Sequence, residues 1–240
     1  MQANGKRQAA QISAELKSLA IPAKAKILQG FFKTGKVQYG EGDVFYGVTV
    51  PRTRAVAVKH ANQAALADVD ALLHSKIHEE RLAALLILVH QFRCGDEKQR
   101  KQIYGFYLKN ASRVNNWDLV DLSSHAIVGA YLYGRDASVL KRLAKSKNIW
   151  ERRIAVVSTF YFISKGDCRD SLEIAEILLH DEHDLIHKAV GWMLREVGKR
   201  CSQKELEQFL NAHAHEMPRT MLRYSIERLP EAKKRLYMMK

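Results

Sequence analysis

A regular spacing of basic residues constrains the fold of this 240-residue chain more than any other feature. The steps Arg-Ile-Ala, Lys-Ala-Val and Arg-Tyr-Ser begin at Arg153, Lys188 and Arg223, so the basic residues stand 35 positions apart, twice in succession. A step of 35 positions backward from Arg153 leads to Asp118, and a further 37 positions lead to Arg81. A period of about 35 residues accommodates two helices and two short turns.

The apolar residues support helices along most of the chain. They recur at spacings of three and four, and the runs 77–92, 150–163 and 185–197 are apolar around most of their circumference. We therefore expect neighbouring helices to cover these runs on both sides. Strand character is confined to 44–50, inside a glycine-containing loop that ends at Pro51, a residue suited to the first turn of a helix.

These patterns predict an all-α fold, a HEAT-like helical repeat solenoid in which residues 1–240 form a single domain. Each repeat would stack on the next and present one helix to the basic concave face of a curved superhelix. On this interpretation, equivalent helical turns carry a ladder of anion-facing, DNA-binding residues: Arg81, Arg153, Lys188 and Arg223. The alternative is that these residues are solvated helix starts.

The charge balance indicates a polyanionic partner. The chain has 39 Lys and Arg against 26 Asp and Glu, a formal net charge of +13, and a basic protein of this kind most often binds nucleic acid. No apolar stretch approaches the roughly 18 residues that a membrane span requires, so we expect no membrane partner. The N-terminal stretch MQANGKRQAAQ has no apolar core, and we therefore expect no secretory signal.

Neither the cysteines nor the histidines form a metal motif. The odd number and scattered positions of Cys94, Cys168 and Cys201 fit a reducing cytoplasm. Three histidines gather near two aspartates between 180 and 187, and we interpret this group as a solvated helix junction in preference to a metal site.

One position breaks the repeat pattern. Three residues after the ladder positions come Ala84, Asp121, Val156, Gly191 and Ile226. We call this position, three residues after each ladder residue, the slot. Four of its five occupants are small or apolar, as a packed position requires, whereas Asp121 is a carboxylate. A carboxylate without a partner is costly to bury, and sequences that break a local rule commonly do so at a functional site.

Tryptophans accompany this carboxylate. Trp117 lies four residues before Asp121, hence on the same helical face, and Trp192 lies in a later repeat. An indole near the basic ladder can offer a π face to a cation, although a tryptophan in a helical repeat is also a common core residue. We assign Trp150 to the core, and we interpret Asp118 as a helix N-terminal carboxylate stabilised by the helix dipole.

Three segments carry a family resemblance: NWDLVD at 116–121, NIWERR at 148–153 and KAVGWMLRE at 188–196. Together they resemble the AlkD family of alkylpurine DNA glycosylases, from about residue 24 to residue 229. The resemblance implies a HEAT-like repeat enzyme that hydrolyses the N-glycosidic bond of N3- and N7-alkylated purines in duplex DNA. It implies a monomer that requires no cofactor and no metal.

The resemblance also assigns roles to residues. Asp121 matches the catalytic carboxylate, Trp117 and Trp192 match indoles that hold the damaged nucleotide, and Arg153 matches a basic residue of the binding cleft. Phe31 stands closest to a tyrosine of the family's aromatic set, so a hydroxyl is lost there while the ring is kept. A carboxylate beside the sugar would stabilise the oxocarbenium-like charge that develops as the bond breaks.

Two other functions stay open. A non-catalytic solenoid could bind nucleic acid through its basic face, but such a binder gains nothing from a carboxylate in its groove. A protein-binding scaffold is a common use of helical repeats, but a scaffold need not be so basic. The preferred lesion, a small methyl group or a bulky adduct, is left open by the sequence.

Overall fold

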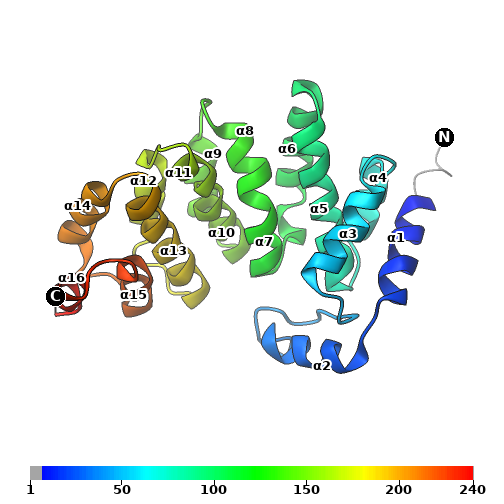
Figure 1. Ribbon diagram of the computed structural model, residues 1–240, viewed down its shortest axis with the longest axis horizontal. Coiled ribbons are helices and arrows are strands. Elements are labelled where there is room, and N and C mark those ends of the chain that lie inside the picture. The colour runs from blue at the N-terminus through cyan, green and yellow to red at the C-terminus, as the bar shows by residue number, and fades with distance from the viewer. Residues whose placement is uncertain (1–6, 240) are drawn as a thin grey trace. The chain divides into compact units, whose positions relative to one another are not determined.

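The computed structural model describes residues 7–239 and places most of them in helices, which are joined by short turns except for the longer loop 32–49 (Figure 1). Within this range the β-structure amounts to one isolated bridge, between Val44 and Ile77, so the prediction of an all-α fold is confirmed. The first six residues of the N-terminal stretch interpreted above lie outside the described range. Among the helices of the described range, none is both long and apolar enough to span a membrane.

Tertiary contacts divide the chain into two compact units, Met1–Ser123 and Ser124–Lys240. The helices of the first unit are α1 (Arg7–Ser18), α2 (Pro22–Phe31), α3 (Val50–His60), α4 (Leu66–Leu73), α5 (His78–Cys94), α6 (Glu97–Lys109), the short 3-10 helix η1 (Ala111–Arg113) and α7 (Trp117–Ser124). Pro51 lies in the first turn of α3, as predicted. Asp96 caps α6 by accepting a hydrogen bond from the Gln99 amide at 2.8 Å, which satisfies one of the free N–H groups of the first turn.

Helix α5 is the central element of the first unit. It corresponds to the predicted apolar run 77–92 and is buried along most of its length, with α1, α3, α4 and α6 packed around it. This arrangement confirms that the run is covered on more than one side. Its first turn is acidic, with Glu79 and Glu80, and both side chains are buried. The polar start of an apolar helix therefore needs partners from elsewhere in the unit.

The segment before α3 supplies those partners. The Glu79 carboxylate accepts hydrogen bonds from the amides of Tyr46, Gly47 and Val48 at 3.0, 2.8 and 3.1 Å. Gly47 has a φ of +83°, and a Cβ there would lie 2.3 Å from the Ile21 carbonyl oxygen, so only glycine fits. The segment 44–49 is therefore a loop that is hydrogen-bonded to the first turn of α5. The Ile21 amide, just before α2, donates to the Tyr46 carbonyl of this loop at 2.9 Å.

The helices of the second unit are the π-helical turn η2 (His125–Gly129), α8 (Ala130–Leu132), α9 (Ser138–Ala144), α10 (Ile149–Ser158), α11 (Phe160–Ser164), α12 (Arg169–Ile177), α13 (Asp184–Arg200), α14 (Gln203–His213), α15 (Arg219–Ile226) and α16 (Glu231–Met238). Helices α10, α13 and α15 begin at positions 149, 184 and 219, which are 35 residues apart. The predicted repeat is therefore confirmed in this unit. Each of these helices packs beside the next, α10 against α13 and α13 against α15.

Two details of packing refine the sequence prediction. The apolar run 150–163 is divided between α10 and α11, because both the amide and the hydroxyl of Thr159 bond to the Val156 carbonyl and tighten the last turn. Gly191 allows α13 and α15 to approach closely, since a Cβ there would lie 2.5 Å from the Met221 carbonyl oxygen. The slot residue of α13 is therefore small because a larger side chain would prevent the close packing of α13 against α15.

Candidate active site

The candidate site is built around the first turn of α7, which begins at Trp117. The side chain of Asn116 accepts a hydrogen bond from the Trp117 amide at 2.8 Å, and the Asp118 carboxylate accepts one from the Leu119 amide at 2.8 Å. These bonds satisfy amides that the helix itself leaves free. The expected role of Asp118 at a helix N-terminus is therefore confirmed, but it is only part of what this carboxylate does.

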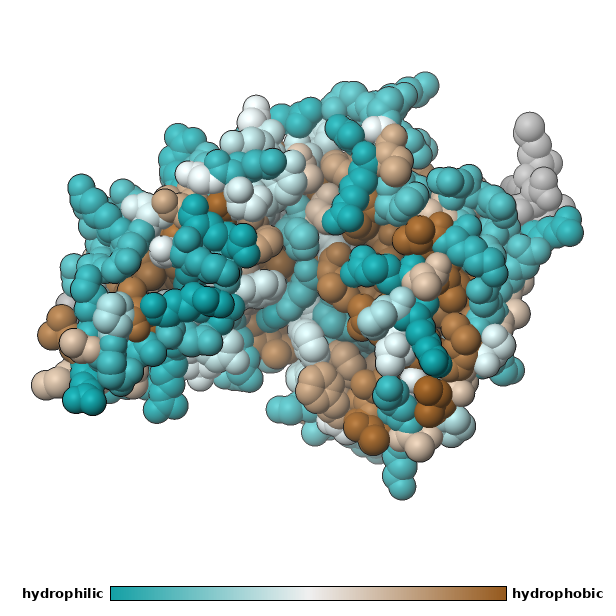
Figure 2. Space-filling view, in the orientation of Figure 1, coloured by the Kyte–Doolittle hydropathy of each residue, from teal (hydrophilic) through white to brown (hydrophobic). Residues whose placement is uncertain are grey.

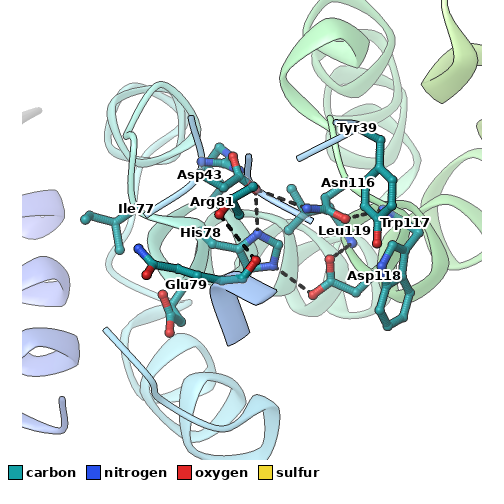
Figure 3. A network of polar contacts seen from close by, with 12 residues as sticks. Tyr39, Asp43, Ile77, His78, Glu79, Arg81, Asn116, Trp117, Asp118 and Leu119 are labelled. Carbon is teal, nitrogen blue, oxygen red and sulfur yellow. Dashed lines mark hydrogen bonds and ion pairs between the residues drawn. The ribbon is translucent and has the colours of Figure 1, made fainter. Parts of the chain in front are cut away.

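A buried network of charged groups ties α7 to α5 (Figure 3). The imidazole of His78 lies between two carboxylates, with Nδ1 3.1 Å from Asp43 Oδ2 and Nε2 2.8 Å from Asp118 Oδ2. The Arg81 guanidinium donates to the other oxygen of Asp43 at 2.6 Å, and Asn116 donates to Asp43 Oδ2 at 3.1 Å. The network thus joins one loop and the starts of two helices.

The charges in this network stabilise one another. Burial by itself lowers the pKa of His78, but the carboxylates of Asp118 and Asp43 outweigh this effect and raise the pKa to about 9. Burial likewise acts to raise the pKa of Asp43, but His78 and Arg81 hold that pKa below its ordinary value. His78 is therefore an imidazolium at neutral pH, paired on both sides.

Aromatic rings cover the network and continue to Trp117. The ring of Phe32 stacks between Trp117 and Phe45, with centroid distances of 5.1 Å on each side. Phe45 in turn stacks on His78 at 4.7 Å, which offers a π face to the imidazolium. Phe31 meets the Trp117 indole edge-on at 5.8 Å and is 60% exposed. The stack holds the indole in place, and Phe31 remains open to solvent.

Beside this stack lies a pocket of about 520 Å³ within the first unit. Its wall is mainly apolar and includes Phe31, Phe45 and Trp117, together with the carboxylates of Asp118 and Asp121. Trp117 and Asp121 both line it, which agrees with their predicted position on one face of a helix. A cationic ligand in such a pocket would meet π faces and negative charge away from bulk water, where electrostatic interactions are stronger.

The residues that occupy the slot in the other repeats, Ala84, Val156, Gly191 and Ile226, are buried, as predicted. Asp121 differs from them, because it is half-buried at the pocket wall. The break in the sequence pattern therefore coincides with a change from a packed position to one that reaches a cavity.

Two residues of the predicted ladder, Arg81 and Arg153, are buried and hydrogen-bonded inside the protein. Arg81 is only 4% exposed, because its guanidinium is bonded to Asp43 and to the Ser75 carbonyl. Arg153 is 5% exposed and donates to the Leu185 carbonyl. Internal acceptors hold both guanidinium groups in this structure, and a DNA contact by either residue stays a prediction.

The remaining predicted residues belong to the second unit. Lys188 is partly exposed and pairs with Asp184 at 2.6 Å, and Arg223 is exposed. Trp192 is half-buried, with its ring centroid 5.9 Å from that of Phe160. Trp150 is buried, which confirms its assignment to the core.

The histidine group between 180 and 187 forms a helix junction, as interpreted. His183 caps α13 by accepting a hydrogen bond from the Leu185 amide at 3.1 Å, and His187 contacts the Asp181 carbonyl. The Asp181 carboxylate pairs with Arg152 at 2.6 Å. Within residues 7–239, no group of three or more Cys, His, Asp or Glu side chains is arranged to hold a metal ion.

Sequence reasoning missed several residues of the site. His78, Asp43, Phe32 and Phe45 were not singled out, because no local pattern reveals contacts between distant positions. Asp43, for example, lies 35 positions from His78 and 73 positions from Asn116. Tyr39 was also missed. Its hydroxyl donates to the carbonyl of Phe31, a residue that lines the pocket, at 3.5 Å.

Comparisons with known proteins agree with the fold. The model of the family described as DNA alkylation repair enzymes matches residues 12–229. Among solved structures, the chain is similar to a predicted DNA alkylation repair enzyme from Enterococcus faecalis, with 16% sequence identity over 88% of this chain and 97% of that chain and a TM-score of 0.68. This likeness shows a shared fold. No curated protein matches the sequence. Because the family model spans most of its length, the chain belongs to the DNA alkylation repair enzyme family.

Proposed function

We propose that this protein is a monofunctional DNA glycosylase that hydrolyses the N-glycosidic bond of cationic N3- and N7-alkylated purines in duplex DNA. The observation that carries the proposal is the position of Asp121 beside Trp117 on the wall of an aromatic pocket. Alkylation at N3 or N7 gives the purine a positive charge and makes it a better leaving group. The protein then needs to stabilise charge on the sugar rather than to protonate the base.

Asp121 is the proposed catalytic carboxylate. As the bond to the base breaks, positive charge passes to the deoxyribose, and an ionised carboxylate beside C1′ stabilises that charge and orients the attacking water. The half-buried position favours this role, because a charge near an apolar wall interacts more strongly than one in bulk water. Trp117 and Phe31 would contact the cationic nucleotide through their π faces, which favours charged lesions over neutral ones.

The second unit is proposed to contribute to DNA binding. Lys188 and Arg223 have side chains that reach solvent, and the net charge of +13 favours a polyanion over the whole chain. Trp192 and Arg153 retain the roles that the family resemblance implies, as a contact to the damaged nucleotide and as support for the cleft. For Arg153 that support would be indirect, since its guanidinium bonds to the Leu185 carbonyl.

The test is base release from duplex DNA that carries 7-methylguanine. Wild-type protein should release the base, and Asp121→Asn should release it on the order of 10²-fold more slowly, the scale of losing one preorganised electrostatic group. DNA affinity and folding stability should hold or increase, because the amide removes a repulsive charge and is easier to desolvate. Asp70→Asn, at an exposed carboxylate of α4, is the matched control and should behave like wild type.

A comparison of lesions tests the role of charge. Duplexes with uracil or hypoxanthine in place of 7-methylguanine should release the base far more slowly, since neutral bases are poorer leaving groups. Wild-type protein that binds duplex DNA but releases no alkylated base would instead favour a non-catalytic nucleic-acid-binding protein. An Asp121→Asn variant that excises normally yet unfolds more easily would make this carboxylate a structural one.

A further inference from the structure

The loop after α2 holds a valine in an unusual position. The side chain of Val37 is 98% exposed, and its backbone has a φ of +63°, a region that β-branched residues rarely adopt. Internal bonds fix this conformation: the Val37 amide donates to Glu41 Oε2 at 2.8 Å, and the Gly40 amide donates to the Lys33 carbonyl at 3.2 Å. Burial of the side chain does not offset the backbone strain at Val37. The strained conformation therefore points to a role for this residue outside folding.

The surroundings of this valine are basic and partly apolar. Between Glu15 and Glu41 the chain has no acidic residue, and it carries lysines at positions 17, 24, 26, 33 and 36. None of the ten residues of α2 is buried, and Ile27 on this helix is 69% exposed. Figure 2 shows apolar surface gathered over the region that α2 occupies in Figure 1. Apolar side chains among lysines match a surface that approaches phosphates and inserts between bases.

The loop is anchored at the candidate site. Two residues after Val37, the Tyr39 hydroxyl donates to the Phe31 carbonyl at 3.5 Å. Phe31 itself contacts the Trp117 indole. The exposed valine is therefore carried on a loop that is hydrogen-bonded to the backbone of Phe31, and Phe31 lines the pocket with Asp121.

We propose that Val37 is a wedge that enters duplex DNA between adjacent base pairs beside the damaged nucleotide. Apolar side chains that penetrate a base step partially unstack it and kink the duplex, while neighbouring cations hold the backbone. Lys33 and Lys36 precede the valine in the same loop and supply that charge. The inference rests on the proposed function in taking DNA as the partner. The uniformly basic stretch favours DNA over an apolar protein surface.

The wedge is tested with a duplex that carries a tetrahydrofuran abasic analogue, which is not hydrolysed, and 2-aminopurine at the neighbouring position. Binding of wild-type protein should unstack the 2-aminopurine and raise its fluorescence. Val37→Gly and Val37→Asn should lose most of that rise and bind about tenfold more weakly, a ratio that corresponds to 1.4 kcal/mol. Both residues tolerate a positive φ, so their melting temperatures should hold or increase. Val37→Ile keeps an apolar tip and should retain the fluorescence rise.

The outcomes separate this inference from the glycosylase proposal. If the Gly and Asn variants unstack the 2-aminopurine as well as wild type does, the wedge is refuted, whatever the excision rate. If wild-type protein unstacks DNA through Val37 but releases no 7-methylguanine, the wedge stands and the glycosylase proposal fails. If wild-type protein does not bind the duplex, or binds it with no change in fluorescence, the wedge is refuted as well.

Discussion

The charge on His78 gives a quantitative prediction about folding stability. Its pKa in the folded protein is about 9, against an ordinary value of 6.5, and each unit of difference corresponds to about 1.36 kcal/mol. The ion pairs with Asp43 and Asp118 therefore contribute about 3 kcal/mol of stability that depends on the proton. Because the folded state holds this proton more tightly, the contribution is complete below pH 6.5. It declines as the pH rises and is lost above about 9.

The perturbation is His78→Gln, which keeps a polar side chain but removes the titrating charge. At pH 6 the variant should be less stable than wild type by about 3 to 5 kcal/mol, since Asp118 loses its cation in a buried site. The difference between the two proteins should shrink by about 3 kcal/mol between pH 6 and pH 10. Comparing the two proteins removes the contributions of other titrating groups that they share.

The assay is urea unfolding at a series of fixed pH values, with the slope m monitored to confirm that the unfolding transition is unchanged. His74→Gln is the matched control, because this histidine is exposed and its pair with Asp70, 3.8 Å away, should contribute about 0–1 kcal/mol. A difference between wild type and His78→Gln that stays constant from pH 6 to pH 10 would refute the reasoning, since it would show that His78 carries no extra proton in the folded state.

Two further predictions concern packing and DNA binding. Gly191→Ala should destabilise the second unit by about 1–3 kcal/mol, because the added Cβ would lie 2.5 Å from the Met221 carbonyl oxygen. Gly105→Ala, with open space around it in α6, should instead stabilise the protein by about 1 kcal/mol. Thermal or urea unfolding of both variants measures these changes, and equal effects on stability would contradict the prediction. The logarithm of the DNA-binding constant should fall linearly with the logarithm of salt concentration, with a slope of about −0.9 per phosphate contact. Lys188→Ala and Arg223→Ala should each make that slope less steep. DNA titrations at increasing salt concentrations measure the slope, and an affinity independent of salt would exclude the electrostatic mechanism.

The sequence predicted those helices and site residues that are determined by local sequence patterns. The 35-residue period gave the starts of α10, α13 and α15, because each repeat solves the same packing problem with the same pattern. Asp121 could be recognised as the exception for a related reason, because a carboxylate among small and apolar residues at equivalent positions is visible in the sequence alone. Burial of the other slot residues, including Gly191, agrees with that logic.

What could not be predicted depends on contacts between distant parts of the chain. Arg81 and Arg153 occupy equivalent repeat positions with Lys188, yet only the lysine reaches solvent to a substantial degree. The difference arises because internal acceptors bind the two guanidinium groups: the Asp43 carboxylate from a loop 38 positions earlier, and the Leu185 carbonyl from the next repeat. A spacing rule identifies equivalent turns, but it does not say which side chains find partners there.

The same distant contacts explain how an irregular region can orient the candidate catalytic helix. Residues 32–49 interrupt the alternation of helices and supply Phe32, Asp43 and Phe45, which surround His78. An apolar cluster of similar size could stabilise the fold as well as this buried charge network does. However, apolar contacts permit small rotations, whereas an imidazolium bonded at both nitrogens fixes the distance and angle between two helix starts. Because Asp118 lies one turn before Asp121, a fixed first turn of α7 also fixes the direction in which Asp121 meets the pocket. The loop that breaks the repeat thus serves the site by constraining the helix that carries the carboxylate.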